Sequence, residues 1–317
     1  MANVGLVKKI MSLSPHIEMM VRRLYWLNVK RLVGRVKVKS KPKNKDTSYS
    51  PYKFDELEVF LQKQGGGKGS LLVVHSAFSS FKGRVEGPDE IIDKLFGFIG
   101  ASGTLAMPGM PVFKNSRPLK NYLSAVKDEE LYVYDVNKSR IKTGVLPSIL
   151  HKRGGLRSRH PINTMVALGP LAGDIMEGNI AGDSPLACGA NSSWKHCVDN
   201  DAIIIGLGTD LTHSLTMIHV AEDVLDTAWP IKDWYIEKNF MIKDGDFEET
   251  RVFRERAPKW GALHFGERTL CKELLAEGIL KSKIIDGVLI ETLNAKKLMH
   301  FLNDRNGFGY PYFWVNK

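Results

Sequence analysis

From about residue 51 the sequence alternates short apolar runs with segments of helical periodicity, and this alternation constrains the fold most strongly. Helices are expected at 54–64, 87–100, 143–153 and 194–200, and strands at 70–76, 103–110, 164–170 and 202–208. The apolar runs are nearly continuous, as strands covered on both faces by helices must be. The pattern predicts an α/β fold, a three-layer α/β/α sandwich around a central mixed or largely parallel sheet.

The excess charge of the chain is confined to its first fifty residues. The formal net charge is +10, and residues 1–50 carry twelve Lys or Arg against two acids, so basic and acidic residues balance in the remainder. Residues 7–36 mix apolar and basic side chains at roughly helical spacing, and 37–50 resemble a solvated linker. We therefore divide the chain into a basic amphipathic N-terminal extension, 1–50, and a domain, 51–317.

Two roles remain open for this extension. It can pack on its own domain or on a partner subunit, which leaves homo-oligomerisation open. Alternatively, residues 1–45 can lie on an anionic membrane surface, which attracts basic residues close to its headgroups. No nucleic-acid-reading motif is present, so nucleic acid is not expected as a partner.

Cysteine usage and hydropathy indicate a cytoplasmic protein, attached at most peripherally to the inner face of the membrane. The three cysteines form no C-x-x-C pair and are odd in number, which argues against a disulfide framework. No apolar run approaches the roughly 18–20 residues that span a bilayer. Cys188 and Cys197 lie near His196, but neighbours in sequence rarely form a catalytic pair, so a cysteine nucleophile is not expected.

Polar residues follow the strands where ligands collect in open α/β sheets. Hydroxyl and basic groups after the first strand suit a phosphate, although an ordinary Ser-rich turn is the competing interpretation and no Walker loop is present. Basic residues also precede the helix at 143–153. The candidates for cofactor binding in these two segments are His75, Ser76, Ser79, Ser80, Lys82, Arg140 and Thr143.

The segment 209–223, TDLTHSLTMIHVAED, crowds two histidines and two acids after the last predicted strand. If a helix begins near Thr212 or Ser214, His219 and Glu222 share a face, and the carboxylate can orient the imidazole as a general base. A zinc site is less consistent, because H-E-x-x-H is missing and His213 and His219 are six apart. A structural role for these histidines is the remaining alternative.

The order of motifs across residues 52 to about 315 resembles the aminoglycoside 3-N-acetyltransferase-like (antibiotic N-acetyltransferase) family. The segments that carry the resemblance are VVHSAFSSFKGRVEGPDEIIDKL, GTLAMPGM, SRIKTGVLPSIL, RSRHPINTMVALGPLA, GDSPLACG and IIIGLGTDLTHSLTMIHVAED. They are similar to the family's VHSSLSS cofactor loop, GTLVMPTF, SRMGALPEAF, RSLHPTHSVAALGPLA, GPGSPF and LLLGVGLDRNTSLHLAEE.

The resemblance implies acetyl transfer from acetyl-CoA, as co-substrate, to an amine of an amino-sugar acceptor, without a metal. It places the catalytic histidine on His219 and its acid on Glu222, and adds His160 and Asp210 as candidate catalytic residues. An ammonium group must lose a proton before it attacks a thioester, and a His–Glu pair can accept that proton.

The departures from the family pattern concern the acceptor. Asn163 and Thr164 replace the usual His-Ser, and extra residues separate Asp210 from His219. Polycationic aminoglycosides favour an acidic site, whereas this chain is basic in its extension. The sequence therefore leads us to expect a nucleotide-linked or glycan-intermediate amino sugar of surface polysaccharide synthesis. The alternatives are an aminoglycoside acceptor in antibiotic resistance, and an inactive member that binds a membrane or a partner.

Overall fold

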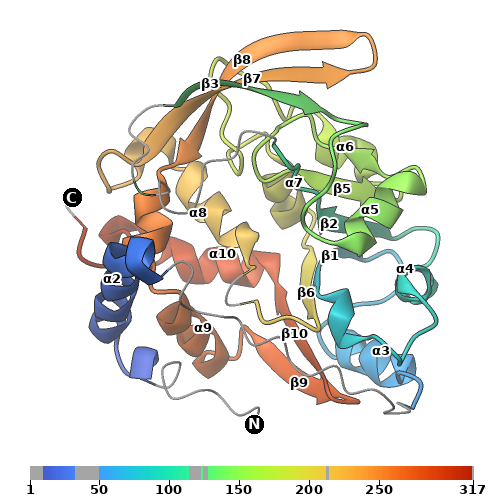
Figure 1. Ribbon diagram of the computed structural model, residues 1–317. Helices are drawn as coiled ribbons and strands as arrows, with labels where there is room; N and C mark the ends of the chain where they lie inside the picture. The colour runs from blue at the N-terminus through green and yellow to red at the C-terminus, as the bar shows by residue number, and fades with distance from the viewer. Residues whose placement is uncertain (1–9, 33–49, 114–122, 124–127, 212–213, 316–317) are drawn as a thin grey trace.

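The computed structural model describes residues 10–32, 50–113, 123, 128–211 and 214–315. Its centre is a mixed seven-stranded sheet with the order β4-β5-β2-β1-β6-β10-β9 (Figure 1). The strands are β1 (Leu71–Ser76), β2 (Thr104–Pro108), β4 (Leu156–Arg157), β5 (Met165–Leu168), β6 (Ile203–Leu207), β9 (Lys281–Ile285) and β10 (Val288–Asn294). β1 pairs in parallel with β2 and β6, and the outer pairs are antiparallel. The predicted α/β class with a mixed sheet is confirmed.

Helices cover both faces of this sheet, as the continuous apolar strands require. In β1, Leu72 and Val74 belong to a core with α3 (Phe54–Gln62), α4 (Pro88–Ile99) and α5 (Val145–Lys152). Leu71 and Val73 point into a second core with the helices of the other face. Those helices are α7 (Ser193–Asp199), α9 (Glu267–Ala276) and α10 (Ala295–Asn303), and the short α6 (Ala172–Met176) contacts α7.

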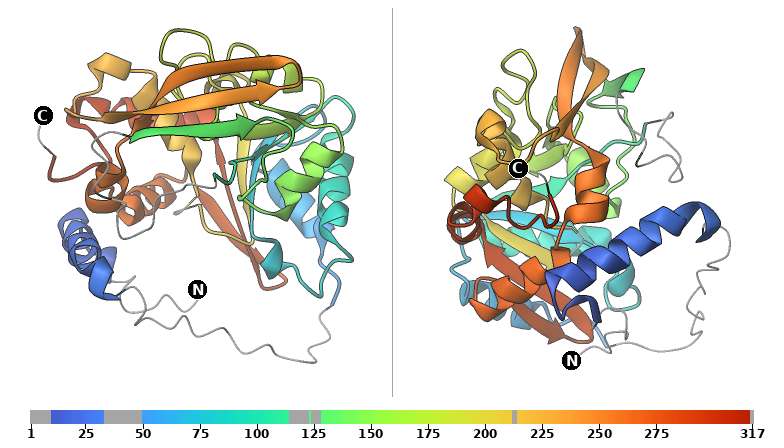
Figure 2. Two further views of the ribbon diagram at one scale, coloured as in Figure 1. Left: turned by 45° about the horizontal axis from the view of Figure 1, so that its top comes forward. Right: turned by 90° about the vertical axis from the view of Figure 1, so that its left-hand side faces the viewer.

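A second, three-stranded sheet shares a core with the helices of that face, and the sequence pattern did not reveal it. It consists of β3 (Asp128–Asp135), β7 (Tyr235–Asp244) and β8 (Phe247–Arg256), in the order β3-β7-β8. Figure 2 shows these strands as a separate layer at one end of the molecule. Gly245, with φ of 62°, closes the β7–β8 hairpin in a backbone region that glycine adopts without strain.

Most of the described part of the N-terminal extension is helix α2 (Pro15–Leu32), which packs against α9 and the π-helical turn η5 (Trp260–His264) (Figures 1 and 2). Packing on its own domain was one of the two roles expected for the extension, and the structure supports it. Among the described residues, no helix is both long enough and apolar enough to cross a bilayer.

The helix expected to start near Thr212 or Ser214 begins later and is shorter. Thr212 and His213 lie outside the described residues. A 3-10 turn, η3 (Thr216–Ile218), leads into α8, which spans His219–Asp223. The backbone therefore coils tightly just where the two predicted catalytic side chains emerge.

Candidate active site

The predicted pair of His219 and Glu222 is assembled in the structure. His219 opens α8 and Glu222 lies three residues on, so both side chains project from the same face of the helix. His219 Nδ1 lies 2.9 Å from Glu222 Oε2. The imidazole side chain is 18% exposed and the carboxylate only 2%. The buried acid therefore holds an imidazole whose other face remains accessible.

Two residues that sequence analysis missed extend this pair. The Tyr312 hydroxyl donates a 2.6 Å hydrogen bond to Glu222 Oε1, and Arg256 Nη1 donates to the Tyr312 hydroxyl. Arg256 ends β8, and Tyr312 comes from the C-terminal segment. A Cβ at Gly261 would lie 2.9 Å from Arg256 Nη2, so the absence of a side chain there makes room for the guanidinium. No local spacing in the sequence links these residues to His219.

The pKa values of the pair favour a neutral imidazole beside an ionised carboxylate. Burial, assisted by Arg256, lowers the pKa of His219, although Glu222 opposes this effect. Burial alone would raise the pKa of Glu222, but His219, Arg256 and the Tyr312 hydroxyl together lower it. With Glu222 ionised, Nδ1–H donates to the carboxylate, and the lone pair of Nε2 is left to accept a proton.

Asp223, the next residue in α8, adds a second buried carboxyl. Its Oδ2 accepts from the Cys188 backbone N–H at 2.9 Å, and its Oδ1 accepts from the Tyr235 hydroxyl at 3.1 Å. Burial and the nearby Glu222 raise the pKa of Asp223 to about 7. Burial and Asp223 also raise the pKa of the fully buried Cys188 thiol, so a thiolate is disfavoured there, consistent with the expectation of no cysteine nucleophile.

Two cavities meet at His219 and Arg256. The first, of about 360 Å³, lies between the three-stranded sheet, α8 and the segments next to β2 and β5. Its wall combines apolar and aromatic side chains with the carboxyls of Glu222, Asp223 and Glu255. The basic groups on this wall are Lys142, Lys238, Arg254 and Arg256. Lys238 pairs with Glu255 at 2.5 Å, and Arg254 pairs with Asp226 at 2.7 Å.

The second cavity, also about 360 Å³, shares His219 and Arg256 with the first. Its wall is formed by Leu211, residues 214–216, Ile218, η5, α9 and, from the N-terminal extension, Arg22 and Trp26 of α2. Apolar side chains alternate there with the hydroxyls of Ser214 and Thr216. The extension is therefore part of the surroundings of the candidate base.

The predicted cofactor segments converge at the carboxyl ends of the parallel strands. Ser80 Oγ donates to Gly208 O at 2.9 Å, which joins the loop after β1 to the end of β6. The Thr143 hydroxyl donates to Pro108 O at the end of β2. A Cβ at Gly144 would lie 4.0 Å from Ser76 O, so the two segments adjoin. Ser79, Lys82 and Arg140 are exposed at this edge.

His75 differs from the other members of the cofactor set because it is buried. It is 5% exposed, and its ring stacks on Trp194 with centroids 6.1 Å apart. Nε2 is buried without a hydrogen-bond partner among the described residues. Burial lowers the pKa of His75 to about 4, so the ring is neutral at physiological pH.

His160 and Asp210 are not on the wall of either cavity. His160 is 2% exposed, and burial lowers its pKa to about 4. Its Nε2 lies 3.3 Å from Pro185 O, and its Nδ1 accepts from the Ile162 N–H at 3.2 Å. His160 thus fixes the loop whose residues 161–163 line the first cavity. The Asp210 backbone carbonyl accepts from the Ser214 hydroxyl at 3.0 Å.

No group of three or more metal-ligating side chains lies close together in the described parts of the chain. The three cysteines are buried and are not joined in disulfides. His213, the partner considered for a zinc site with His219, lies outside the described residues. Nothing in the geometry of His219 and Glu222 requires a metal, since the carboxylate itself orients the imidazole.

Comparison with known proteins agrees with this geometry. The family model described as aminoglycoside 3-N-acetyltransferase matches residues 73–305. Aminoglycoside N(3)-acetyltransferase VIII of Streptomyces fradiae is 29% identical over 174 residues, which cover 51% of this chain and 57% of the relative. Aminoglycoside N(3)-acetyltransferase III of Salmonella sp is 31% identical over 189 residues, covering 55% of this chain and 60% of the relative. The matched segments thus span less than two thirds of these relatives.

Solved structures share the fold. The crystal structure of aminoglycoside acetyltransferase AAC(3)-Xa aligns with a TM-score of 0.64 at 20% identity, covering 80% of this chain and 92% of that one. AAC-IIIb in a binary complex with CoASH aligns with a TM-score of 0.61 at 22% identity, covering 83% and 100%. The matched family model covers most of the chain, including both residues of the pair, and the chain therefore belongs to the aminoglycoside 3-N-acetyltransferase family.

Proposed function

We propose that this protein is an acetyl-CoA-dependent N-acetyltransferase that acetylates an amino group of an aminoglycoside-type amino sugar. The observation that carries the proposal is the position of His219, which is paired with Glu222 and lines two cavities at once. A base at that point can reach one substrate in each cavity. The named relatives are aminoglycoside N(3)-acetyltransferases, and one structural neighbour holds CoASH.

The chemistry follows from the tautomer that Glu222 selects. The acceptor reacts as the neutral amine, after its ammonium form has lost one proton to solvent, and Nε2 of the neutral His219 takes a second proton from the nitrogen as it attacks the thioester carbonyl. The new C–N bond forms a tetrahedral intermediate, which collapses with cleavage of the C–S bond. The leaving thiolate then takes the proton from His219, so the base returns to its starting state. Arg256, between the cavities, adds positive charge close to the developing oxyanion.

Within this proposal the first cavity receives the acceptor. Glu222, Asp223 and Glu255 supply carboxyls on its wall, which suit the ammonium groups of an amino sugar. Asp223, with a pKa of about 7, becomes fully ionised once an ammonium lies beside it. Two structural neighbours with acceptors bound carry apramycin and sisomicin, consistent with an amino-sugar acceptor.

The second cavity receives the acyl end of acetyl-CoA. Its apolar wall and the hydroxyls of Ser214 and Thr216 suit an uncharged arm with amide groups. Ser80, in the predicted cofactor loop, bonds to Gly208, only three residues before Leu211 of the cavity wall. The exposed Lys82 and Arg140 would then contact the phosphates, outside the cavity. His160 acts as a positioning residue, and we assign Asp210 no chemical step.

An anionic glycan intermediate is the weaker acceptor candidate. Its basis was the basic charge of the chain, but that charge lies in the extension, whereas the first cavity mixes acids and bases. None of the relatives or neighbours described above is named for polysaccharide synthesis, and the aminoglycoside alternative agrees better with them. The proposal includes a cytoplasmic location, where acetyl-CoA is available.

Thiol release from acetyl-CoA tests the proposal directly. The full-length protein is supplied with a panel of aminoglycosides and, in parallel, with nucleotide-linked amino sugars. Turnover with an aminoglycoside and an N-acetylated product identified by mass spectrometry support the proposal. Turnover only with nucleotide-linked sugars would restore the glycan acceptor. Absence of turnover with every amine, despite CoA binding measured by calorimetry, would indicate an inactive member of the family.

A further inference from the structure

Helix α2 lies outside the residues that the family model matches, 73–305, yet it borders the second cavity. Arg22 and Trp26 are on the wall of that cavity, four residues apart and therefore on the same side of α2. His219 and Arg256 belong to the same wall. A molecule that fills this cavity therefore contacts both the N-terminal extension and the candidate base.

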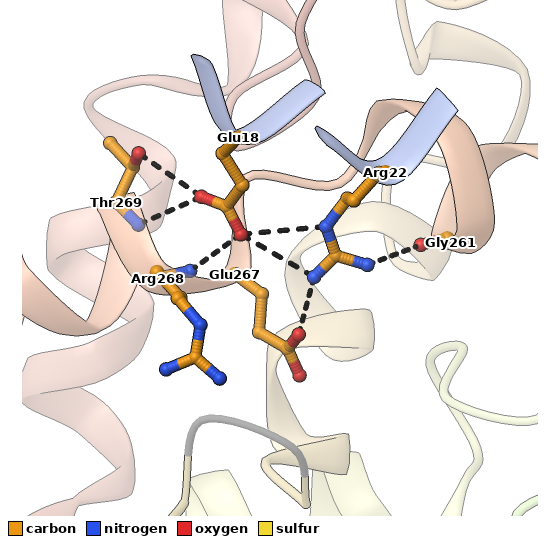
Figure 3. A network of polar contacts seen from close by, with 6 residues as sticks. All are labelled: Glu18, Arg22, Gly261, Glu267, Arg268 and Thr269. Atoms are coloured by element: carbon orange, nitrogen blue, oxygen red, sulfur yellow. Dashed lines mark hydrogen bonds and ion pairs between the residues drawn. The ribbon is translucent and has the colours of Figure 1, made fainter. Parts of the chain in front are cut away.

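Helix α2 is held in this position by a buried carboxylate and a buried apolar side chain. Glu18 is fully buried, and its carboxylate accepts from the backbone N–H groups of Arg268 at 3.0 Å and of Thr269 at 3.2 Å (Figure 3). Both N–H groups belong to the first turn of α9, which offers them no acceptor of its own, so Glu18 caps that helix. Met19, the next residue of α2, is also fully buried.

Arg22 connects this anchor to the wall of the cavity. Its guanidinium donates to the carboxylates of Glu18 and Glu267 and, at 3.3 Å, to the Gly261 carbonyl (Figure 3). Glu267 and Gly261 also line the second cavity. Gly261 lies against Arg256 as well, since a Cβ there would be 2.9 Å from Arg256 Nη2. The position of α2 is therefore linked through Gly261 to an arginine that borders both cavities.

A second set of contacts joins α2 to the C-terminal segment. Trp314 Nε1 donates to His16 Nδ1 at 2.8 Å, and Cζ of Arg23 lies 4.9 Å from the centre of the Trp314 ring. Trp314 follows Tyr312 by two residues, and the Tyr312 hydroxyl donates to the carboxylate of Glu222. Helix α2 therefore contacts the segment that holds the acid of the pair in addition to the wall of the second cavity.

The charges on this wall favour an uncharged occupant over a polycation. Arg22 and Arg256 contribute two guanidinium groups to the described part of the wall, and Glu267 contributes a carboxylate. An acceptor with several ammonium groups is disfavoured beside two guanidinium groups. The arm of acetyl-CoA, which carries amide groups and no charge, meets no such repulsion.

We propose that α2 is a component of the acyl-donor site, in which Arg22 and Trp26 contact the arm of acetyl-CoA. This inference rests on the proposed function, which assigns the second cavity to the donor. The Trp26 ring provides apolar surface for the arm, and the Arg22 guanidinium donates to an amide oxygen. Glu18 acts as a positioning residue, because it fixes the helix that presents both side chains. Donor binding and the docking of α2 stabilise each other, because the coupling of two binding free energies is reciprocal.

Hydrogen exchange followed by mass spectrometry tests this inference on the full-length wild type. Amide exchange in α2 is measured for the protein alone, with CoA and with an aminoglycoside. CoA at concentrations well above its dissociation constant should slow exchange in α2 at least about tenfold, because the bound arm must leave before the helix detaches. The control is α3, which belongs to the core on the other face of the sheet and should exchange equally with and without CoA.

Steady-state kinetics of arginine variants provides the second measurement. Arg22→Met should raise the KM for acetyl-CoA about tenfold, the usual effect of losing a hydrogen bond from a charged group, and leave the KM for the acceptor within about twofold. Arg22→Lys, which keeps the charge, should recover part of the loss. Arg153→Met is the matched control, since Arg153 pairs with Asp89 and Asp93 and lines neither cavity, so both of its KM values should match the wild type.

The outcomes distinguish a failure of this inference from a failure of the acetyl-transfer proposal. Turnover and CoA binding with unchanged exchange in α2, or the same KM for acetyl-CoA in Arg22→Met and the wild type, would overturn this inference alone. Protection of α2 by the aminoglycoside instead of CoA would also overturn it, since the extension would then border the acceptor. Absence of both CoA binding and turnover with every amine would overturn the proposed function, and this inference with it.

Discussion

Tyr312 donates a 2.6 Å hydrogen bond to Glu222, on the carboxylate oxygen that does not contact His219. The base is therefore oriented by a buried acid that is itself held by a second group. Arg256 donates to the same tyrosine hydroxyl and completes a relay of four side chains. In this account the relay keeps Glu222 ionised and His219 neutral, the states that general-base catalysis requires.

Tyr312→Phe should lower kcat about tenfold, because a hydrogen bond to a charged group contributes roughly 1.5–3 kcal/mol. The ring is retained, so packing should change little. Steady-state kinetics on the purified variant provides the measurement. Tyr310→Phe is the control, since the Tyr310 hydroxyl bonds to Glu273 and not to the pair. If the two variants have the same kcat, the tyrosine has no role in orienting Glu222.

The pH dependence of the rate should respond in opposite directions to two substitutions. Activity requires the neutral imidazole, and its pKa lies below the ordinary 6.5, so the acid limb of the wild-type profile should lie below that pH. Glu222 raises the pKa of His219, so Glu222→Gln should move the limb to still lower pH and reduce the rate. Arg256 lowers that pKa, so Arg256→Met should move the limb upward. If the acid limb of the pH–rate profile moves in the same direction in both variants, a group other than His219 controls that limb.

Trp26→Ala should raise the KM for acetyl-CoA, because the indole lines the cavity assigned to the acyl donor. Loss of a large apolar contact with the bound acyl donor suggests about a tenfold effect. Leu27→Ala, the next residue on α2 and 75% exposed, should leave the KM unchanged. Titration calorimetry with CoA would report the same difference without turnover. If the variant instead binds the acceptor more weakly and its affinity for CoA is unaltered, the assignment of the two cavities is reversed.

Glu18→Ala should destabilise the protein by about 2–3 kcal/mol, since it leaves buried donors at the start of α9 without their acceptor. The free energy of unfolding in urea is the quantity to measure. Leu24→Ala, on the exposed side of the same helix, should be nearly neutral and serves as the control. Equal stability of the two variants would show that the cap on α9 contributes little.

The sequence predicted the central strands and the pair well because both depend on local spacing. The apolar runs at 70–76 and 202–208 became β1 and β6, and the three-residue interval between His219 and Glu222 became a hydrogen bond. The cofactor segments were also expected at one edge of the sheet, and the bonds of Ser80 to Gly208 and of Thr143 to Pro108 place the two segments at the ends of β6 and β2.

The features that sequence analysis missed depend on contacts between segments that are far apart in the chain. Tyr312 reaches Glu222 across 90 positions, and Glu18 reaches α9 across about 250, so no periodicity could reveal either contact. The second sheet was missed because β7 and β8 carry many charged residues on strands that are only half buried. His160 shows the opposite case. It was predicted as a catalytic residue from its motif, but its ring lies behind the wall of the first cavity and is hydrogen-bonded to backbone groups.

The central claim is that His219 acts as the base between two substrates, and His219→Ala tests it most directly. We predict that kcat falls on the order of 10²–10⁴-fold, the usual contribution of general-base catalysis. CoA affinity, measured by calorimetry on the same preparation, should stay within about twofold, because the base acts on the amine. A variant that retains more than about a tenth of wild-type turnover at saturating substrates would contradict the claim, because another group would then take the proton.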